Sequence, residues 1–251
     1  MLRRLTILSL LLVFIFASCE DKKSSAKTKA ESSPATTKVT EKEEDSAAVA
    51  AKKVQDSIKK AEEEKKKDPH PIAQEELIPF LTKYGKENPE NKIRIKTKYG
   101  NIDVTLYRDT PLHRANFIML TKNGYFDDTY FHRVAPGFVI QGGNSDNRST
   151  SHKRHENGSY LIPSEFDAGH KHNYGAFSMA KYSEQNVSKA SSPYEFFIVM
   201  DPNGAHHLDN EHTVFGYVTD GMDVAEKISH VKTGQSEWPI DNVEMDIDVV
   251  E

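Results

Sequence analysis

The chain of 251 residues has a single cysteine, Cys19, so neither an internal disulfide nor a cysteine zinc cluster can form. It has no excess of basic residues, and its formal net charge of −5 argues against nucleic acid as a main partner. Glycine, at 13 residues, is too scarce for a collagen-like chain, and an aromatic content of 9% argues against a wholly disordered one. The length allows one or two folded domains.

The longest apolar run is short and lies near the N-terminus. Arg3 and Arg4 precede the apolar stretch 5–16, and two small residues then lead directly to Cys19. This order is typical of a signal peptide, and the stretch is too short to span a bilayer comfortably. Residues 1–18 resemble a bacterial lipoprotein signal, which implies that Cys19 is lipidated after cleavage. A plain signal peptide with a leftover thiol and a true membrane anchor are the alternatives.

Residues 19–68 lack glycine and aromatic residues, and half of them are charged. Such a segment cannot bury enough apolar surface to fold alone, so we expect a linker that holds the rest of the chain away from the membrane. Residues 47–67 contain strong helix formers with Glu62 and Lys66 in the favourable i,i+4 order, which predicts a solvated helix. A coiled coil is the alternative, but the apolar stripe is short of three heptads.

The composition changes near residue 80. All glycines lie beyond it, and so do all aromatic residues outside the signal except Phe80 itself. We therefore assign residues 69–90 to a lead-in segment and residues 91–251 to the folded domain. In the lead-in segment, Leu77, Phe80 and Leu81 predict a short helix that docks on this domain.

The folded domain has the pattern of a mainly β protein. Alternating apolar residues at 93–106, interrupted by a turn signal at 99–101, predict a β-hairpin. Thr110 and Pro111 predict the N-cap and first position of a helix that ends near residue 122. A second helix is predicted at residues 222–229, and further strands at 137–141, 176–180, 196–200, 213–218 and 249–251. Two helices among many short strands predict a closed barrel with helices over its ends.

Residues 131–143 (FHRVAPGFVIQGG) place Arg133, Phe138 and Gln141 close together between turn residues. Taken alone, the segment is compatible with a barrel strand that carries an incidental arginine. It closely resembles the cyclophilin family of peptidyl-prolyl cis-trans isomerases, and further motifs follow in the order of that family. These are Thr110-Pro111, Ala115-Asn116-Phe117, residues 162–166 (IPSEF), 177–180 (FSMA) and 195–198 (EFFI), Leu208-Asp209, His212 and residues 214–216 (VFG).

The resemblance covers about residues 91–251. It implies a closed eight-stranded antiparallel barrel with two capping helices and a substrate groove on its outer face. It also implies peptidyl-prolyl cis-trans isomerase activity on proline-containing polypeptides. The signal peptide and the charged linker precede this barrel.

The expected chemistry follows from the bond that rotates. Rotation about an X–Pro bond breaks amide resonance, with a barrier of about 18–20 kcal/mol. In the twisted state the proline nitrogen regains its lone pair, so a fixed donor to that nitrogen stabilises the transition state more than the ground state. Arg133 is the candidate donor, because its guanidinium is always charged and carries a rigid fork of N–H groups. No nucleophile, metal or cofactor is required.

The resemblance also assigns the remaining site residues. Arg133, Phe138 and Gln141 are expected to be catalytic, with Gln141 holding the substrate carbonyl and orienting Arg133. Phe138, Val139, Phe197 and Leu208 are expected to form the proline socket. The full set expected to bind substrate is Val139, Ala180, Lys181, Tyr182, Glu195, Phe197, His207, Leu208 and His212.

Three departures from the family pattern matter, and one of them is a pair of residues. Glu195 replaces a glutamine, and a carboxylate there can pair with Arg133 and weaken its pull on the proline nitrogen. Lys181 and Tyr182 replace a small Asn-Ala pair and change the groove walls. His207 stands where many eukaryotic members carry the tryptophan associated with cyclosporin binding, so we expect weak inhibition by cyclosporin. Residues 183–193 predict a polar, mobile loop that sets substrate choice.

Three histidine pairs, at residues 152 and 155, 170 and 172, and 206 and 207, can suggest a metal site. No cysteine supports any of them, and we expect histidines in solvated loops instead.

We expect a monomeric isomerase that is lipid-anchored through Cys19 in a bacterial cell envelope, on the periplasmic face of the outer membrane. Its substrates would be exported or envelope proteins. One alternative is a proline-peptide-binding chaperone or scaffold with attenuated catalysis, which Glu195 favours. Another is a structural lipoprotein in which the linker carries the function. A rate measurement separates the first two, and deletion of the linker tests the third.

Overall fold

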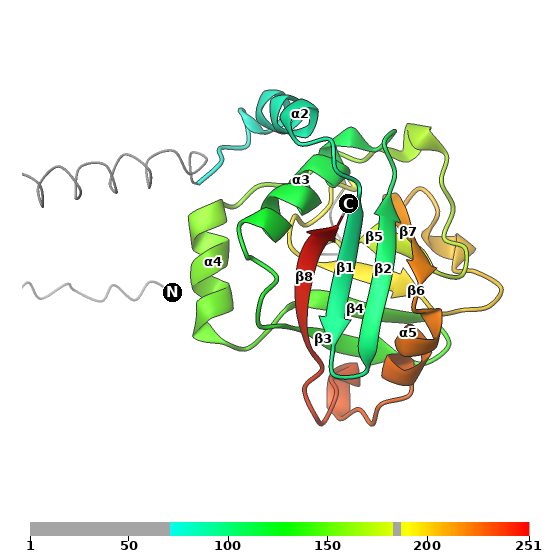
Figure 1. The fold of residues 1–251 in the computed structure, drawn as a ribbon. Helices are drawn as coiled ribbons and strands as arrows, with labels where there is room; N and C mark the ends of the chain where they lie inside the picture. Colours follow the sequence, from blue (N-terminus) through cyan, green and yellow to red (C-terminus); the bar gives the residue numbers. More distant parts are fainter. Residues whose placement is uncertain (1–70, 183–186, 251) are drawn as a thin grey trace, which may run out of the picture. The chain divides into compact units, whose positions relative to one another are not determined.

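The alternating apolar residues of the domain form β-strands in the structure, a computed structural model that describes residues 71–182 and 187–250. The strands are β1 (Lys92–Thr97), β2 (Gly100–Leu106), β3 (Thr129–Ala135), β4 (Val139–Asn144), β5 (Ala176–Met179), β6 (Phe196–Val199), β7 (Val214–Asp220) and β8 (Glu244–Val250). They pair antiparallel in the order β1-β2-β7-β5-β6-β4-β3-β8 and close into a barrel (Figure 1). The predicted eight-stranded antiparallel barrel is confirmed.

The described residues also hold four α-helices and three single turns of 3-10 helix. The α-helices are α2 (Leu77–Glu87), α3 (Pro111–Lys122), α4 (Arg148–Asn157) and α5 (Met222–Ser229). The 3-10 turns are η1 (Phe166–Ala168), η2 (His206–Leu208) and η3 (Gln235–Glu237). Helices α3 and α5 cover opposite ends of the barrel, as expected, whereas α4 was not predicted (Figure 1). In this part of the chain, no helix is long and apolar enough to cross a membrane.

Aromatic rings fill the interior of the barrel around one side chain of α3. Phe117 is fully buried, and its ring centroid lies 4.6–5.6 Å from those of four other phenylalanines. Those four are Phe126, Phe177, Phe196 and Phe215. Three of them belong to β5, β6 and β7, so Phe117 joins the capping helix to one wall of the barrel.

The N-terminus of α3 is capped by a distant side chain. Thr110 stands at the N-cap position, but its hydroxyl donates to the carbonyl of Tyr107 instead of accepting from the helix. The carboxylate of Glu165 accepts from the backbone N–H groups of Leu112 and His113, each at 3.0 Å. A negative charge at a helix N-terminus is favourable, so Glu165 takes the role that the sequence predicted for Thr110.

Helix α2 docks on the barrel as the lead-in sequence predicted. Leu77 and Leu81 are fully buried in the main core. Arg114 of α3 donates to the carbonyls of Gly85 in α2 and of Glu90 just after it, at 2.8 and 3.0 Å. Because the last carbonyls of a helix have no partners within it, this buried arginine both closes α2 and attaches it to α3.

Some sequence-based predictions concern residues that the structure does not describe. The signal peptide, Cys19 and the linker fall within residues 1–68, outside the described ranges. Residues 183–186 of the predicted groove loop also lie outside them. These predictions remain as stated.

Candidate active site

A groove of about 220 Å³ lies on the outer wall of the barrel, on a small apolar cluster separate from the interior core. Its lining residues come from β3, β4 and the turn between them, β6, the segment after β5, η2 and the loop before β7. They are Arg133, Phe138, Val139, Gln141, Ala180, Lys181, Phe197, Leu208 and His212. The structure therefore brings together nine of the twelve site residues expected from the sequence.

Strand register places the central residues of this groove side by side. Arg133 of β3 is the cross-strand partner of Gln141 in β4, and Gln141 is in turn the partner of Phe197 in β6. Directly opposed residues of antiparallel strands point to the same face of a sheet. The donor, the amide and the aromatic ring therefore form one row across three strands.

The apolar part of the groove combines buried and partly buried side chains. Val139 and Phe197 are buried, and the ring of Phe197 meets that of His212 edge-on at 5.3 Å. Phe197 also stacks with His172 at 5.8 Å. A ring packed against two imidazoles can offer a defined surface to an apolar ligand.

His172 corrects one prediction from the sequence, because it is fully buried and not solvated. Its Nδ1 lies 2.9 Å from Asp209 Oδ1, and its Nε2 lies 3.0 Å from Ser178 Oγ. Burial lowers the pKa of His172 to about 4 despite the nearby carboxylate, so the ring is neutral at physiological pH. Within residues 71–182 and 187–250, no three His, Cys, Asp or Glu side chains form a group that could hold a metal ion.

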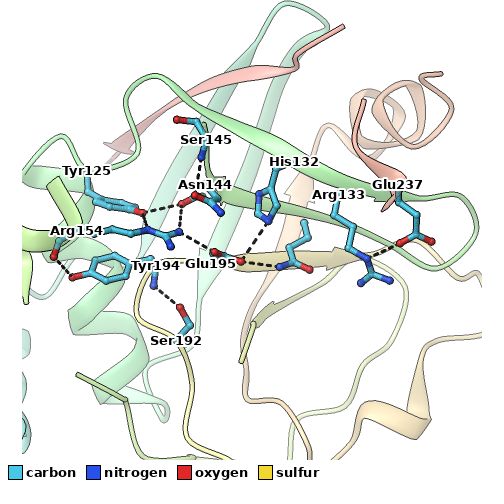
Figure 2. A network of polar contacts seen from close by, with 12 residues as sticks. Tyr125, His132, Arg133, Asn144, Ser145, Arg154, Ser192, Tyr194, Glu195 and Glu237 are labelled. Carbon is cyan, nitrogen blue, oxygen red and sulfur yellow. Dashed lines mark hydrogen bonds and ion pairs between the residues drawn. The ribbon is translucent and has the colours of Figure 1, made fainter. Parts of the chain in front are cut away.

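Arg133 pairs with a residue that the sequence analysis did not identify. Its Nε donates to Glu237 Oε2 at 2.6 Å (Figure 2). Its guanidinium carbon lies 5.8 Å from the ring centre of Phe138. Glu237 ends the turn η3, where Ser236 and Glu237 both have positive φ, at 64° and 61°. Non-glycine residues adopt this conformation at a cost in free energy, and such strain is concentrated at functional sites.

The expected pairing of Glu195 with Arg133 is wrong. Glu195 accepts instead from Gln141 Nε2 at 3.0 Å and from Arg154 Nη2 at 2.8 Å, and its carboxylate lies 3.4 Å from His132 Nε2 (Figure 2). Burial alone would raise the pKa of Glu195, but the contacts with His132 and Arg154 outweigh it and lower the pKa to about 2. The carboxylate is ionised and lies behind the groove.

Two other expected residues do not line the groove. The imidazole of His207 is exposed and stacks against the ring of Phe138 at 5.4 Å, so it lies beside the socket. Tyr182 is 54% exposed. Lys181 does line the groove, and its ammonium lies 3.3 Å from the carboxylate of Glu211.

Arg154 and Glu237 are the main site residues that sequence reasoning missed. Arg154 lies on the unpredicted helix α4, and Glu237 is 104 residues from Arg133 in the chain. Both contacts depend on tertiary structure, and no local spacing indicates them.

Comparison with known proteins gives a consistent result. Residues 92–249 match the family described as cyclophilin type peptidyl-prolyl cis-trans isomerase/CLD. The chain is 37% identical over 145 residues to a peptidyl-prolyl cis-trans isomerase of Acinetobacter baylyi, covering 56% of this chain and 73% of that protein. It is 37% identical over 158 residues to the peptidyl-prolyl cis-trans isomerase-like 2 of Rhizopus delemar, covering 62% of this chain but only 28% of that protein.

A solved structure supports the same fold. It is a cyclophilin type peptidyl-prolyl cis-trans isomerase of Cryptosporidium parvum, crystallised in the presence of the dipeptide Ala-Pro. The likeness has a TM-score of 0.54 and 27% sequence identity, and it covers 64% of this chain and 99% of that one. The matched region spans β1 to β8, and therefore the whole barrel and every residue that lines the groove. On the sequence match and the barrel together, the chain belongs to the cyclophilin-type peptidyl-prolyl cis-trans isomerase family.

Proposed function

We propose that the chain accelerates cis–trans rotation of X–Pro bonds in exported or envelope polypeptides, with Arg133 donating to the proline nitrogen in the transition state. The observation that carries this proposal is the row of Arg133, Gln141 and Phe197 in one groove with an apolar wall. The Ala-Pro dipeptide used with the Cryptosporidium relative supports a proline-containing ligand.

One part of the groove is apolar and binds the proline ring, and the other part supplies the hydrogen-bond donor. Val139, Phe197 and Leu208 provide the apolar surface for the proline ring. Arg133 supplies the donor. Because its Nε is already bound to Glu237, the terminal Nη groups are the ones available to the substrate. An ionic hydrogen bond is stronger in such a partly dry site than in water.

The first test is a rate measurement. The full chain is added to a peptide that contains one Ala-Pro bond, and the exchange between cis and trans signals is followed by NMR. Uncatalysed exchange takes tens of seconds, so acceleration is easily detected. Binding of the peptide without acceleration would contradict the proposal and support a proline-peptide-binding scaffold.

One observation favours that second function. The carboxylate of Glu237 neutralises part of the charge of Arg133, which reduces its pull on the proline nitrogen. We nevertheless assign Glu237 a positioning role, because it binds Nε and leaves the Nη groups in place for a substrate.

Replacement of Glu237 distinguishes positioning from charge neutralisation. Both side chains of the pair are partly exposed, at 38% and 47%, and exposed ion pairs contribute up to about 1 kcal/mol. We expect Glu237→Ala to lower kcat/KM by about two- to fivefold. Glu237→Gln keeps an acceptor for Nε and should stay near the wild-type rate. A rate increase in Glu237→Gln would show that neutralisation dominates, and that Glu237 restrains the enzyme.

Cyclosporin provides a further prediction. His207 is exposed beside Phe138 and offers a smaller, more polar surface than a tryptophan. We expect weak inhibition of the wild-type chain in a cyclosporin titration of the isomerase rate, and tighter inhibition of His207→Trp. Submicromolar inhibition of the wild type would contradict this prediction.

We also propose that the protein is a monomer attached to the outer membrane of a bacterium through acyl chains on Cys19. The signal-like sequence of residues 1–19 supports this proposal. Each acyl CH₂ that enters the bilayer contributes about 0.8 kcal/mol, so several chains on one residue give lasting attachment. Cys19→Ser should abolish labelling with palmitate and move the protein out of the membrane fraction.

A further inference from the structure

Arg154 of helix α4 lies outside the groove, yet its guanidinium is held on several sides. Its Nε donates to the hydroxyl of Tyr125 at 2.9 Å, and its Nη2 donates to Glu195 Oε1 at 2.8 Å. The guanidinium carbon lies 5.3 Å from the ring centre of Tyr194 (Figure 2). These contacts fix the cation at one place behind the groove.

Glu195 transmits this constraint to the groove. Its side chain is only 15% exposed, and its two oxygens face different partners. Oε1 accepts from Arg154, whereas Oε2 accepts from Gln141 Nε2. The side chain of Gln141 lines the groove, so one carboxylate links the arginine behind the groove to an amide within it.

The ionised carboxylate decides which way the amide of Gln141 is turned. A carboxylate can only accept hydrogen bonds, so the NH₂ group of Gln141 must be the group that faces it. Oε1 of Gln141 is then left to accept from the cross-strand neighbour Arg133 or from a substrate N–H. An amide oxygen cannot bind a substrate carbonyl, so this orientation replaces the role that the resemblance implied for Gln141. A glutamine at position 195 could donate as well as accept, and it would permit either orientation of Gln141.

We propose that Arg154 and Glu195 form a positioning pair that fixes the side-chain amide of Gln141 with its oxygen directed to the peptide groove. The expected effect of this pair on the isomerisation rate rests on the proposed function. The orientation of the Gln141 amide does not depend on it. Neither residue touches the reacting bond. Both act through Gln141.

The proposal predicts a new dependence on pH when Arg154 is removed. The groups that face Glu195 are Arg154 from α4, His132 from β3 and Gln141 from β4, with the hydroxyls of Tyr125 and Tyr182 also nearby. Without the arginine, the carboxylate keeps its contact with His132 but loses that with Arg154, so its pKa rises above the wild-type value. As the pH falls through the raised pKa, the carboxyl gains a proton and can donate, so the amide of Gln141 is released from its single orientation.

The experiment compares the pH profile of kcat/KM between pH 4.5 and 8 in the full-length wild type, Arg154→Gln, Glu195→Gln and the double variant. We expect the wild-type profile to show no step from Glu195 in this range, because its carboxylate stays ionised. In Arg154→Gln, kcat/KM should fall by about tenfold toward the acid end of this range. A tenfold change in rate corresponds to the free energy of about one hydrogen bond. The double variant keeps His132 but has no carboxyl to titrate, so this acid loss should disappear from its profile.

Arg94→Gln is the matched control. Arg94 makes an equally short pair with Asp103, at 2.7 Å, and neither residue lines the groove. Its pH profile should follow that of the wild type. A profile in a folded Arg154→Gln that follows that of the wild type, or an additional acid loss that persists in the double variant, would overturn the proposal.

The orientation can be measured without any rate. The side-chain NH₂ signals of Gln141 in ¹⁵N-labelled protein should shift or double in Glu195→Gln and stay unchanged in Arg94→Gln. Glu195→Gln alters no volume, so it decides the question even where Arg154→Gln fails to fold. An unchanged Gln141 signal in Glu195→Gln would overturn the proposal. Absence of isomerase activity in the wild type, together with the expected shift, would reject the proposed function and leave the positioning pair in place.

Discussion

Arg133→Ala should lower kcat/KM for an Ala-Pro peptide by about two to three orders of magnitude, the usual cost of removing one donor to a transition state. The loss should fall on kcat, because the lone pair on the proline nitrogen develops only as the bond twists. Peptide affinity should change little, since the apolar wall made by Val139, Phe197 and Leu208 remains. Arg133→Lys should recover only part of the rate, because an ammonium lacks the planar fork.

The measurement needs binding and rate from the same samples. Peptide affinity comes from a chemical-shift titration, and the rate comes from exchange spectroscopy. Arg94→Ala serves as the control, because it removes another arginine from a short carboxylate pair outside the groove. An Arg133→Ala variant that keeps a third or more of the wild-type rate would remove Arg133 from the mechanism. A loss of affinity that matches the loss of rate would make Arg133 a binding residue only.

The parts of the fold that the sequence predicted are those where local pattern and tertiary packing agree. Ile93 and Ile95 alternate with polar residues, and both are buried in β1. Helix α5 has an apolar stripe that includes Val224 and Ile228, and it lies where the sequence placed it. In each case the residues that favour the element are also the residues that pack against the barrel.

Helix α4 was missed because its sequence, RSTSHKRHEN, has no apolar stripe. The only buried residues of this helix are Thr150 and Asn157. The guanidinium of Arg154 contacts the side chains of Tyr125, Tyr194 and Glu195. Polar contacts of this kind have no sequence period. The spacing of hydrophobic residues therefore does not predict a helix that is stabilised by such contacts.

The groove itself was predicted better than the residues behind it. Its lining residues follow the family motifs and occupy opposed positions on neighbouring strands. The predicted ion-pair partner of Arg133 was wrong because Glu195 and Glu237 are both far from Arg133 in the chain. Only the path of the turn η3 brings Glu237 to the guanidinium. A glutamate in place of a glutamine at position 195 indicates that a counter-ion is needed. The sequence does not show which residue supplies that counter-ion.

Phe117→Ala should destabilise the barrel by about 3–5 kcal/mol, because it leaves a cavity where a fully buried ring stood. The ring touches phenylalanines from three strands and from the segment that follows α3, so few of its neighbours can move to fill the space. Domains of this size are stable by about 5–15 kcal/mol, so one substitution removes a large share of the total. Phe117→Leu keeps most of the volume and should cost less than about 2 kcal/mol.

Trp238 is the only tryptophan of the chain, and its ring lies 5.6 Å from that of His132 in the barrel wall. Its fluorescence therefore reports unfolding of the barrel in urea without a contribution from the linker. Ile240→Ala is the matched control, because Ile240 is 66% exposed and its loss should change the free energy of unfolding by no more than about 0.5 kcal/mol. A cost below about 1 kcal/mol for Phe117→Ala would mean that the interior repacks. In that case the ring of Phe117 would contribute little to the attachment of α3 to the barrel.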